Sequence, residues 1–588
     1  MSATQISPEV VASPEASTGA ANRWRNGVLC AVLVAACLWI AWPVSRMGFV
    51  DDWSYARTAQ VFAQTGHFAY NGFATAMLGS QIVWGAMFIK VFGFSFTILR
   101  VSMLPLAMAS VFLFHDILRG FGVNPRNAVI GTLTLGLSPL FMPLADSFMT
   151  DIPGLLVILI CLYCCQRAVV SSRARTAILW LMAASATSVV GGTVRQIVWL
   201  GALVMVPSAA WMLRRKRGIV PACALLWLAS LAGVLLIMSW FAHQPYSLQE
   251  FLLAPILYNG LKSLVQIPGD IIASLFLSLL ILYPIVVAWV GKVRQLRRAS
   301  LPKYLLLVGA CVLMQFTGQR SLPWLGHVLV TEFAGHRTAA LCVAEFDSFL
   351  LPFWARALVG AAVIATGLLL AIDLRQAARS MPAQSPRTMA DRPWLILLAP
   401  YTVAYFLLLC PRAALGGLLD RYLLGVLPVF IVWLLLFFQC RRGPELPRSS
   451  VAILIVFAGL GIAGTHDWFA FQRARNVAID EVLASGVSRD RIQAGVEYDG
   501  WTQLLYGGYV NSRLMRQPGL FHEPAAASRI PPACQSDFFD AASAIDPEFS
   551  VGFDPQTCFA PTAYPPVRFT KWLPPFRQTV TVQRNIPQ

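Results

Sequence analysis

Apolar stretches of membrane-spanning length recur along almost the whole chain, separated by short polar connections. A helix needs about 20 predominantly apolar residues to cross a bilayer. The stretches that fit this pattern are 28–44, 97–118, 128–144, a fourth that ends near residue 163, a fifth and a sixth on either side of 195–196, 220–241, 271–290, 304–316, 350–372, 394–410, 422–438 and 451–463. The pattern predicts a polytopic α-helical membrane protein with about thirteen transmembrane helices.

The remaining segments predict other kinds of structure. The apolar segment 81–96 is interrupted by Lys90 and Gly93, so we expect a helix at the membrane interface. Residues 1–22 are rich in Ser, Ala, Pro and Thr and predict a disordered tail. Residues 466–588 predict a small α/β or α+β domain, with a turn at 497–501. The expected domains are therefore 1–22, 23–465 and 466–588.

Charge gives these spans an orientation. The 588 residues are 57% hydrophobic and only 12% charged, yet carry a formal net charge of +17. The basic residues lie in short blocks in every second connection, which the positive-inside rule assigns to the cytoplasm. This places the N-terminus in the cytoplasm and residues 466–588 outside it, where Cys534 and Cys558 could form a disulfide. Because the charge is not gathered on one soluble face, we expect no nucleic-acid partner.

Polar residues that could take part in catalysis or binding follow the first apolar stretch. Residues 48–57 bring together Asp51, Asp52 and Arg57. Carboxylates are costly inside hydrocarbon but tolerated in a water-filled cavity at its edge. These two acids either end a span or belong to a polar site at the membrane surface.

Three more charged residues, Asp151, Arg195 and Arg421, fall at the same predicted ends of other spans. Carboxylates suit deprotonation of an incoming hydroxyl or amine, and guanidinium groups suit binding of a phosphate. Together they predict one cavity for transfer from a lipid-anchored, phosphate-linked donor. Arg195 alone fits a short hairpin tip equally well. Four histidines expected in loops on this side lack ligand spacing and predict no metal site: His243, His327, His336 and His466.

Several short motifs, in order along residues 23–463, carry a family resemblance. Residues 51–56 (DDWSYA), followed by 66–68 (GHF), resemble the first-loop motif of GT-C membrane glycosyltransferases. The resemblance is nearest to the branch with protein O-mannosyltransferases and the lipid A aminoarabinose transferase. Residues 90–93 (KVFG) and 150–153 (TDIP) resemble two further motifs of these enzymes, and 420–422 (DRY) followed by Pro428 resembles a late one.

The resemblance implies a multi-pass enzyme of the bacterial inner membrane with a polyprenyl-phosphate-sugar donor. Its acceptor would be a lipid, glycan or protein modified on the periplasmic side. Asp51 would be the catalytic base, Asp52 its neighbour and Asp151 an acid that orients donor or acceptor. The donor phosphate would be held by Arg57, Lys90, Arg195 and Arg421. A divalent metal stays open as a cofactor, because metal use varies within the superfamily.

The sequence departs from the family pattern at two positions, and two other functions also have to be considered. Ser54 occupies a position where the aminoarabinose branch commonly has Arg, and Asp52 replaces Glu. A transporter or flippase for a lipid-linked anionic substrate is the main alternative, and it predicts an internal repeat with ionisable groups near the bilayer midplane. The sequence has no clear repeat and gathers its ionisable residues at span ends, which favours the enzyme. A non-catalytic assembly subunit would make Asp51 and Asp52 dispensable.

Overall fold

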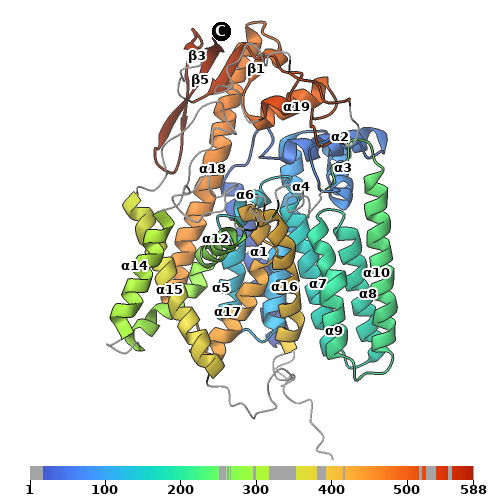
Figure 1. Cartoon of the computed structure of the whole chain (residues 1–588), viewed down its shortest axis with the longest axis vertical. Helices are drawn as coiled ribbons and strands as arrows, with labels where there is room; N and C mark the ends of the chain where they lie inside the picture. The colour runs from blue at the N-terminus through green and yellow to red at the C-terminus, as the bar shows by residue number, and fades with distance from the viewer. Residues whose placement is uncertain are drawn as a thin grey trace, which may run out of the picture.

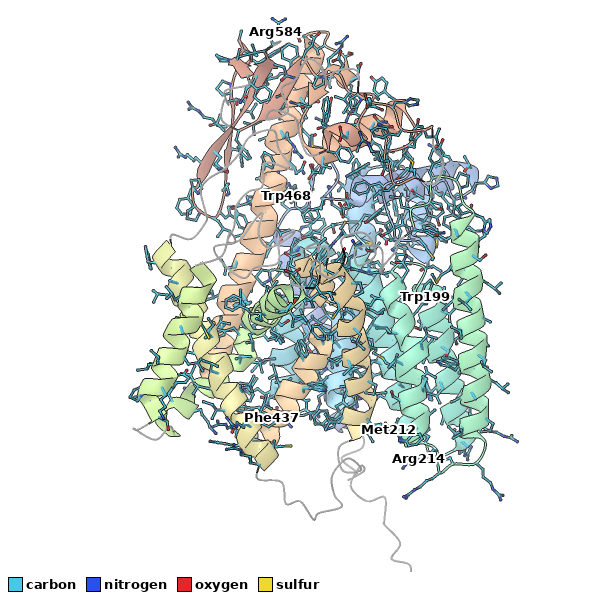
Figure 2. The ribbon with its side chains drawn as sticks, viewed as in Figure 1. Trp199, Met212, Arg214, Phe437, Trp468 and Arg584 are labelled. Atoms are coloured by element: carbon cyan, nitrogen blue, oxygen red, sulfur yellow. The ribbon has the colours of Figure 1, made fainter. Side chains whose placement is uncertain are left out.

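A long helical bundle carries a small sheet at one of its ends (Figure 1). The computed structural model describes residues 18–249, 260, 264, 266–295, 300–316, 353–379, 393–414, 418–515, 519–524, 538–553 and 559–586. We call the end of the bundle beside the sheet the sheet end, and the opposite end, marked by Arg214 in Figure 2, the arginine-rich end. Arg584 lies beyond the sheet end in the same view.

Most of the predicted spans form helices. The α-helices are α1 (Thr18–Ile40), α2 (Asp52–Thr65), α3 (Gly79–Phe92), α4 (Phe96–Gly120), α5 (Pro125–Gly136), α6 (Phe141–Ala145), α7 (Asp151–Val170), α8 (Ala174–Gly191), α9 (Val206–Met212), α10 (Ile219–Ala242), α12 (Gln266–Ile281), α13 (Tyr283–Val286), α14 (Leu301–Phe316), α15 (Phe353–Arg379), α16 (Pro393–Ala414), α17 (Leu427–Arg441), α18 (Arg448–Ala484) and α19 (Val496–Tyr506). Among the described residues, eight helices are long and apolar enough to cross a membrane, and a bent pair makes a ninth candidate. The polytopic helical fold class is confirmed, whereas the count of thirteen spans stays a prediction.

Prolines explain why some predicted spans are broken. The stretch 128–144 divides into α5 and α6 around Pro139, and Ser138 caps the new start by accepting the Phe141 N–H at 3.1 Å. The stretch 271–290 bends by 69° between α12 and the segment Tyr283–Arg294, whose second residue is Pro284. Proline cannot donate a backbone hydrogen bond, but it fits the first turn of a new helix. Hydropathy alone does not register these breaks.

The basic residues separate the two ends of the bundle. Several helices carry Arg or Lys in their last turn at the arginine-rich end: Arg119 in α4, Arg167 in α7, Arg379 in α15 and Arg441 in α17. By contrast, α2 and α7 have Asp52 and Asp151 in their first turns, where the helix dipole favours a negative charge.

Over the described part of the C-terminal region, the sheet has five strands: β1 (Ile492–Gln493), β2 (Phe549–Gly552), β3 (Phe559–Pro561), β4 (Val567–Thr570) and β5 (Arg577–Asn585). Its order is β1-β2-β5-β3, with β4 paired to β5. Only β1 and β2 are parallel; the other pairs are antiparallel. The predicted mixed α and β class of this region is confirmed, but residues 497–501 form part of α19, so the predicted turn is wrong.

One helix joins the sheet to the bundle. α18 runs unbroken for 37 residues, past the predicted last span end at residue 463, and its upper part packs on the sheet through Phe471, Ala478 and Val482. Arg475 on α18 forms a fully buried ion pair with Glu497 on α19 at 2.9 Å. α19 in turn lies against α2, where Gly500 leaves room for the indole of Trp53. The first turn of α2 is therefore packed against the small domain.

Candidate active site

Arg100 of α4 fixes the loop that leads into α2. Its buried guanidinium donates to the carbonyl oxygens of Ser45 (2.9 Å) and Met47 and lies 4.8 Å from the ring centroid of Phe469. Buried carbonyl groups need such partners, because an unpaired one costs free energy. This bracing sets the position from which α2 begins, directly after Asp51.

Asp52 joins two loops at the sheet end. Its Oδ1 accepts the N–H of Phe49 at 2.6 Å, and its Oδ2 accepts the N–H of Phe148 at 3.0 Å. Gln81 Nε2 donates to the Phe148 carbonyl oxygen at 2.7 Å, which holds the second loop from its other side. Burial raises the pKa of Asp52 to about 6, although Arg100 and the two backbone N–H groups oppose this shift. The buried Asp52 therefore joins, through its two hydrogen bonds, the loops that carry Asp51 and Asp151.

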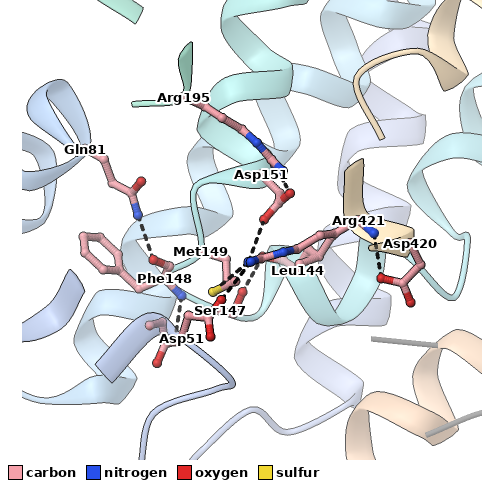
Figure 3. Close-up of polar contacts among 11 residues, drawn as sticks. Asp51, Gln81, Leu144, Ser147, Phe148, Met149, Asp151, Arg195, Asp420 and Arg421 are labelled. Carbon is pink, nitrogen blue, oxygen red and sulfur yellow. Dashed lines mark hydrogen bonds and ion pairs between the residues drawn. The ribbon is translucent and has the colours of Figure 1, made fainter. Parts of the chain in front are cut away.

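Four predicted site residues meet in one ion-pair cluster (Figure 3). Arg421 Nη2 lies 2.8 Å from Asp51 Oδ2, and Arg421 Nη1 lies 3.9 Å from Asp151 Oδ2. Arg195 Nη1 pairs with the other oxygen of Asp151, Oδ1. The four residues come from the starts of α2, α7, η1 (Gln196–Trp199) and η8 (Asp420–Leu423). We call this set the sheet-end cluster.

Burial differs sharply within the sheet-end cluster. The side chain of Asp151 is 0% exposed and that of Arg421 10%, whereas Asp51 keeps 18% of its side-chain surface. Burial lowers the pKa of Arg421, but Asp51 and then Asp151 raise it more, so the net shift is upward. Asp51 is therefore the more solvent-accessible of the two acids in the cluster.

Tyrosines line the cluster. Arg195 lies 5.0 Å and Arg421 5.7 Å from the ring centroid of Tyr422, within the range of a cation–π contact. Tyr405 Oη donates to the Tyr422 carbonyl oxygen at 2.6 Å. Burial, followed by the nearby Asp51 carboxylate, raises the pKa of the Tyr55 hydroxyl, so Tyr55 stays protonated at neutral pH. Tyr55 and Tyr422 lie within the quoted motifs, but their place beside the cluster was not predicted from the sequence.

Asp420 fixes the turn that presents Arg421. Its side chain is fully buried, and its Oδ1 accepts the backbone N–H of Arg421 at 2.6 Å. A carboxylate that caps a backbone N–H at the start of a short helix satisfies a donor that the helix leaves unpaired. Its position beside Arg421 in the motif was the available signal for this role.

The other predicted site residues lie elsewhere. Arg57 donates to Gln60 at 2.8 Å within α2, and Lys90 is exposed in the last turn of α3. Cys534 and Cys558 lie outside the described residues, as do His327 and His336. His466 belongs to α18, so its assignment to a loop is wrong.

Metal-binding side chains are scattered rather than grouped in the part of the chain that the structure describes. Over the described part of the chain, no group of three or more His, Cys, Asp or Glu side chains is arranged to hold a metal ion. The two acids of the sheet-end cluster are engaged by guanidinium groups.

Comparison with known proteins adds the following. No protein-family model matches the sequence, and no curated protein matches it. Among solved structures, the chain is similar to the protein O-mannosyltransferase Pmt1-Pmt2 complex of S. cerevisiae bound to the sugar donor (16% identity, TM-score 0.31, 39% of this chain and 34% of that one). It is also similar to apo ArnT from Cupriavidus metallidurans (12% identity, TM-score 0.35, 81% of this chain and 84% of that one). A third similar structure is the archaeal oligosaccharyltransferase AglB from Archaeoglobus fulgidus in complex with an inhibitory peptide and a dolichol-phosphate (15% identity, TM-score 0.42, 89% of this chain and 64% of that one).

These structural neighbours are GT-C glycosyltransferases. The chain spans about a third of the yeast chain's length and less than two thirds of the archaeal one. At these identities and TM-scores the likeness assigns no role to any residue of this chain.

Proposed function

We propose that the protein is a glycosyltransferase that moves a sugar from a polyprenyl-phosphate donor to a lipid, glycan or protein acceptor. The observation that carries this proposal is the sheet-end cluster, where a partly exposed carboxylate, Asp51, shares a guanidinium group with a second, buried carboxylate, Asp151. The cluster pairs a group that can accept a proton with groups that can bind a phosphate. It lies at helix starts, where a substrate anchored in the bilayer can present its headgroup.

Asp51 is the proposed general base. A base must come within hydrogen-bond distance of the acceptor proton, which requires an accessible carboxylate. Asp51 retains 18% side-chain exposure, while Asp151 has none and Asp52 is held by two backbone N–H groups. The latter two acids are proposed to position the site: Asp151 orients Arg195 and Arg421, and Asp52 keeps the two loops together.

Arg195 and Arg421 are the proposed ligands of the donor phosphate. In the transfer step, the acceptor oxygen forms a bond to the anomeric carbon while the bond from that carbon to the phosphate oxygen breaks. The acceptor proton goes to Asp51, and the electron pair leaves with the polyprenyl phosphate. Guanidinium groups stabilise the negative charge that develops on the departing phosphate. Arg57 bonds to Gln60 and Lys90 is exposed in the last turn of α3, so this proposal gives neither residue a role at the donor phosphate.

The basic residues support an orientation for the reaction. Arg119, Arg167, Arg379 and Arg441 close helices at the arginine-rich end, which the positive-inside rule places in the cytoplasm. The sheet end then faces the periplasm of a bacterial inner membrane. We propose that transfer occurs there.

Transfer of labelled sugar from polyprenyl-phosphate donors tests the proposal with the full chain in purified membranes. We expect Asp51→Asn to lower the rate about 10²- to 10⁴-fold, the usual contribution of a general base. Asp480→Asn is the matched control, because Asp480 of α18 is a half-exposed acid that pairs with Arg46 in the loop between α1 and α2. Both variants should accumulate to normal levels.

The outcomes separate the alternatives. Unchanged transfer by Asp51→Asn, with loss at normal levels of folded protein in Asp52→Asn or Asp151→Asn, would move the base to one of those residues. Failure of every donor, together with movement of lipid-linked sugar across vesicles that contain the protein, would replace the enzyme with a transporter.

A further inference from the structure

A groove of about 720 Å³ lies between α18 and the β4–β5 hairpin, away from the sheet-end cluster. Its floor includes apolar side chains, among them Val477 of α18 and Phe569 of β4. Its basic lining comes from His466 and Arg473 of α18 and from Arg568 and Arg577 of the hairpin. None of the twelve lining residues carries a carboxylate.

The groove lies at the level where the bundle ends. Arg473 Nη1 donates to the carbonyl oxygens of Trp42 (3.0 Å) and Val44 (3.2 Å), just beyond the end of α1 at Ile40. Trp39 and Trp42 are both more than half exposed, which is typical of aromatic residues at a membrane–water interface. Arg473 therefore ties the groove to the interfacial end of a membrane-spanning helix.

The hairpin turn adds a second interfacial feature. Trp572 is 47% exposed and Phe576 is 61% exposed, on a turn closed by the Lys571 N–H donating to the Phe576 carbonyl oxygen at 2.8 Å. Asp467 of α18 accepts the N–H groups of Trp572 (2.7 Å) and Leu573 (2.9 Å). The turn is thus fixed against α18, and it points toward the bundle (Figure 1).

The charge of the groove is unbalanced. Arg568 and Arg577 are exposed, and neither makes an ion pair with a residue that the structure describes. Arg473 is bonded to backbone carbonyls rather than to an acid. Asp467 of α18 is not among the lining residues; its carboxylate accepts two backbone N–H groups of the turn and contacts His466 Nδ1 at 3.0 Å. An anion that enters the groove therefore displaces no carboxylate.

We propose that this groove binds an anionic phospholipid from the leaflet at the sheet end, with the phosphate headgroup on Arg568 and Arg577. Guanidinium groups recognise phosphate, and the apolar floor and the exposed Trp572 and Phe576 accommodate the adjoining acyl region. This lipid site stands independently of the proposed transferase activity, because it shares no residue with the sheet-end cluster.

Binding of tail-labelled phosphatidylglycerol to the full chain in neutral detergent tests this proposal by fluorescence anisotropy. We expect unlabelled phosphatidylcholine to compete at least about tenfold less well than phosphatidylglycerol. A basic residue near an anionic lipid surface contributes about fivefold in affinity, so Arg568→Gln with Arg577→Gln should weaken binding roughly 30-fold. Arg584→Gln is the matched control, because Arg584 is exposed on the same strand, at the far end of the molecule (Figure 2).

A second variant keeps the test independent of charge. Trp572→Ala with Phe576→Ala should also weaken binding of the labelled phosphatidylglycerol. Inorganic phosphate should not compete with this lipid. Competition by sodium phosphate at the concentration of the lipid would instead indicate a free phosphate site and overturn the proposal. Equal binding by the double arginine variant and the control would overturn it too.

Discussion

The strongest prediction on stability contrasts two buried acids that lie five residues apart. Asp151 is 0% exposed and is paired with Arg195 and Arg421. Asp151→Asn leaves the buried guanidinium group of Arg421 and the partly exposed one of Arg195 with Asp51 as the remaining carboxylate of the cluster. Removing one partner of a buried ion pair costs about 3–5 kcal/mol, because the other charge stays buried without compensation. We expect a loss of that size in the free energy of unfolding.

Asp146→Asn is the matched control for that loss. Asp146 is also buried, but it makes no ion pair with a described residue, and burial raises its pKa well above the usual value. Burial favours the neutral form of this carboxyl, so replacing it by an amide of similar shape removes no ion pair with a described residue and should cost little. We therefore expect a change within about 1 kcal/mol for this variant.

The assay is thermal unfolding of both purified full-length variants in the same detergent at pH 7, followed by tryptophan fluorescence. Asp151→Asn should unfold several degrees below wild type and Asp146→Asn close to it. Equal midpoints for the two variants would refute the reasoning, because burial alone, rather than pairing with the guanidinium groups, would then set the cost.

Three further predictions concern other parts of the molecule. Burial raises the pKa of Asp499 from 3.8 to about 7, so the folded state keeps a proton that the unfolded state releases. The free energy of unfolding should therefore fall as pH rises from about 4 to 7, by up to roughly 4 kcal/mol. Asp499→Asn should flatten this dependence in unfolding experiments at several pH values. Gly500→Ala places a methyl group about 2.6 Å from the Trp53 ring, so it should cost about 1–3 kcal/mol in unfolding experiments, whereas Gly486→Ala, strained but open to solvent, tests backbone effects alone. Arg421→Lys keeps the charge but loses the two-pronged contact with Asp51 and Asp151, so sugar transfer should fall at least about tenfold with unchanged protein levels; full activity would show that charge alone suffices.

Sequence pattern predicted that the site residues share one end of the bundle, but it did not predict their partners. Asp151, Arg195 and Arg421 lie at ends of apolar stretches, and helix ends on one side of a bundle are near one another. Which guanidinium group meets which carboxylate depends on helix packing and on the short turn that Asp420 holds, and neither has a periodic signal. The sequence therefore predicted the composition of the cluster better than its contacts.

Helix geometry explains why Arg57 lies apart. Residues 51–57 are close in sequence, but six residues along a helix correspond to a rotation of about 240°, which turns Arg57 to a different face from Asp51. Its contact with Gln60, three residues further on the same helix, follows from the same geometry. Knowledge of where α2 begins would have separated these two residues, but hydropathy did not locate that helix.

The balance of charge in the sheet-end cluster links donor binding to the proposed base. Two guanidinium groups face two carboxylates, so an arriving phosphate has to compete with a carboxylate for Arg421. Asp151 is buried and also held by Arg195, whereas Asp51 is partly exposed and lies at the start of α2. Asp51 is therefore the partner that the phosphate displaces at least cost. On the proposed mechanism, the same exchange that seats the donor releases Asp51 to accept the acceptor's proton, which confines the active base to the donor-bound state.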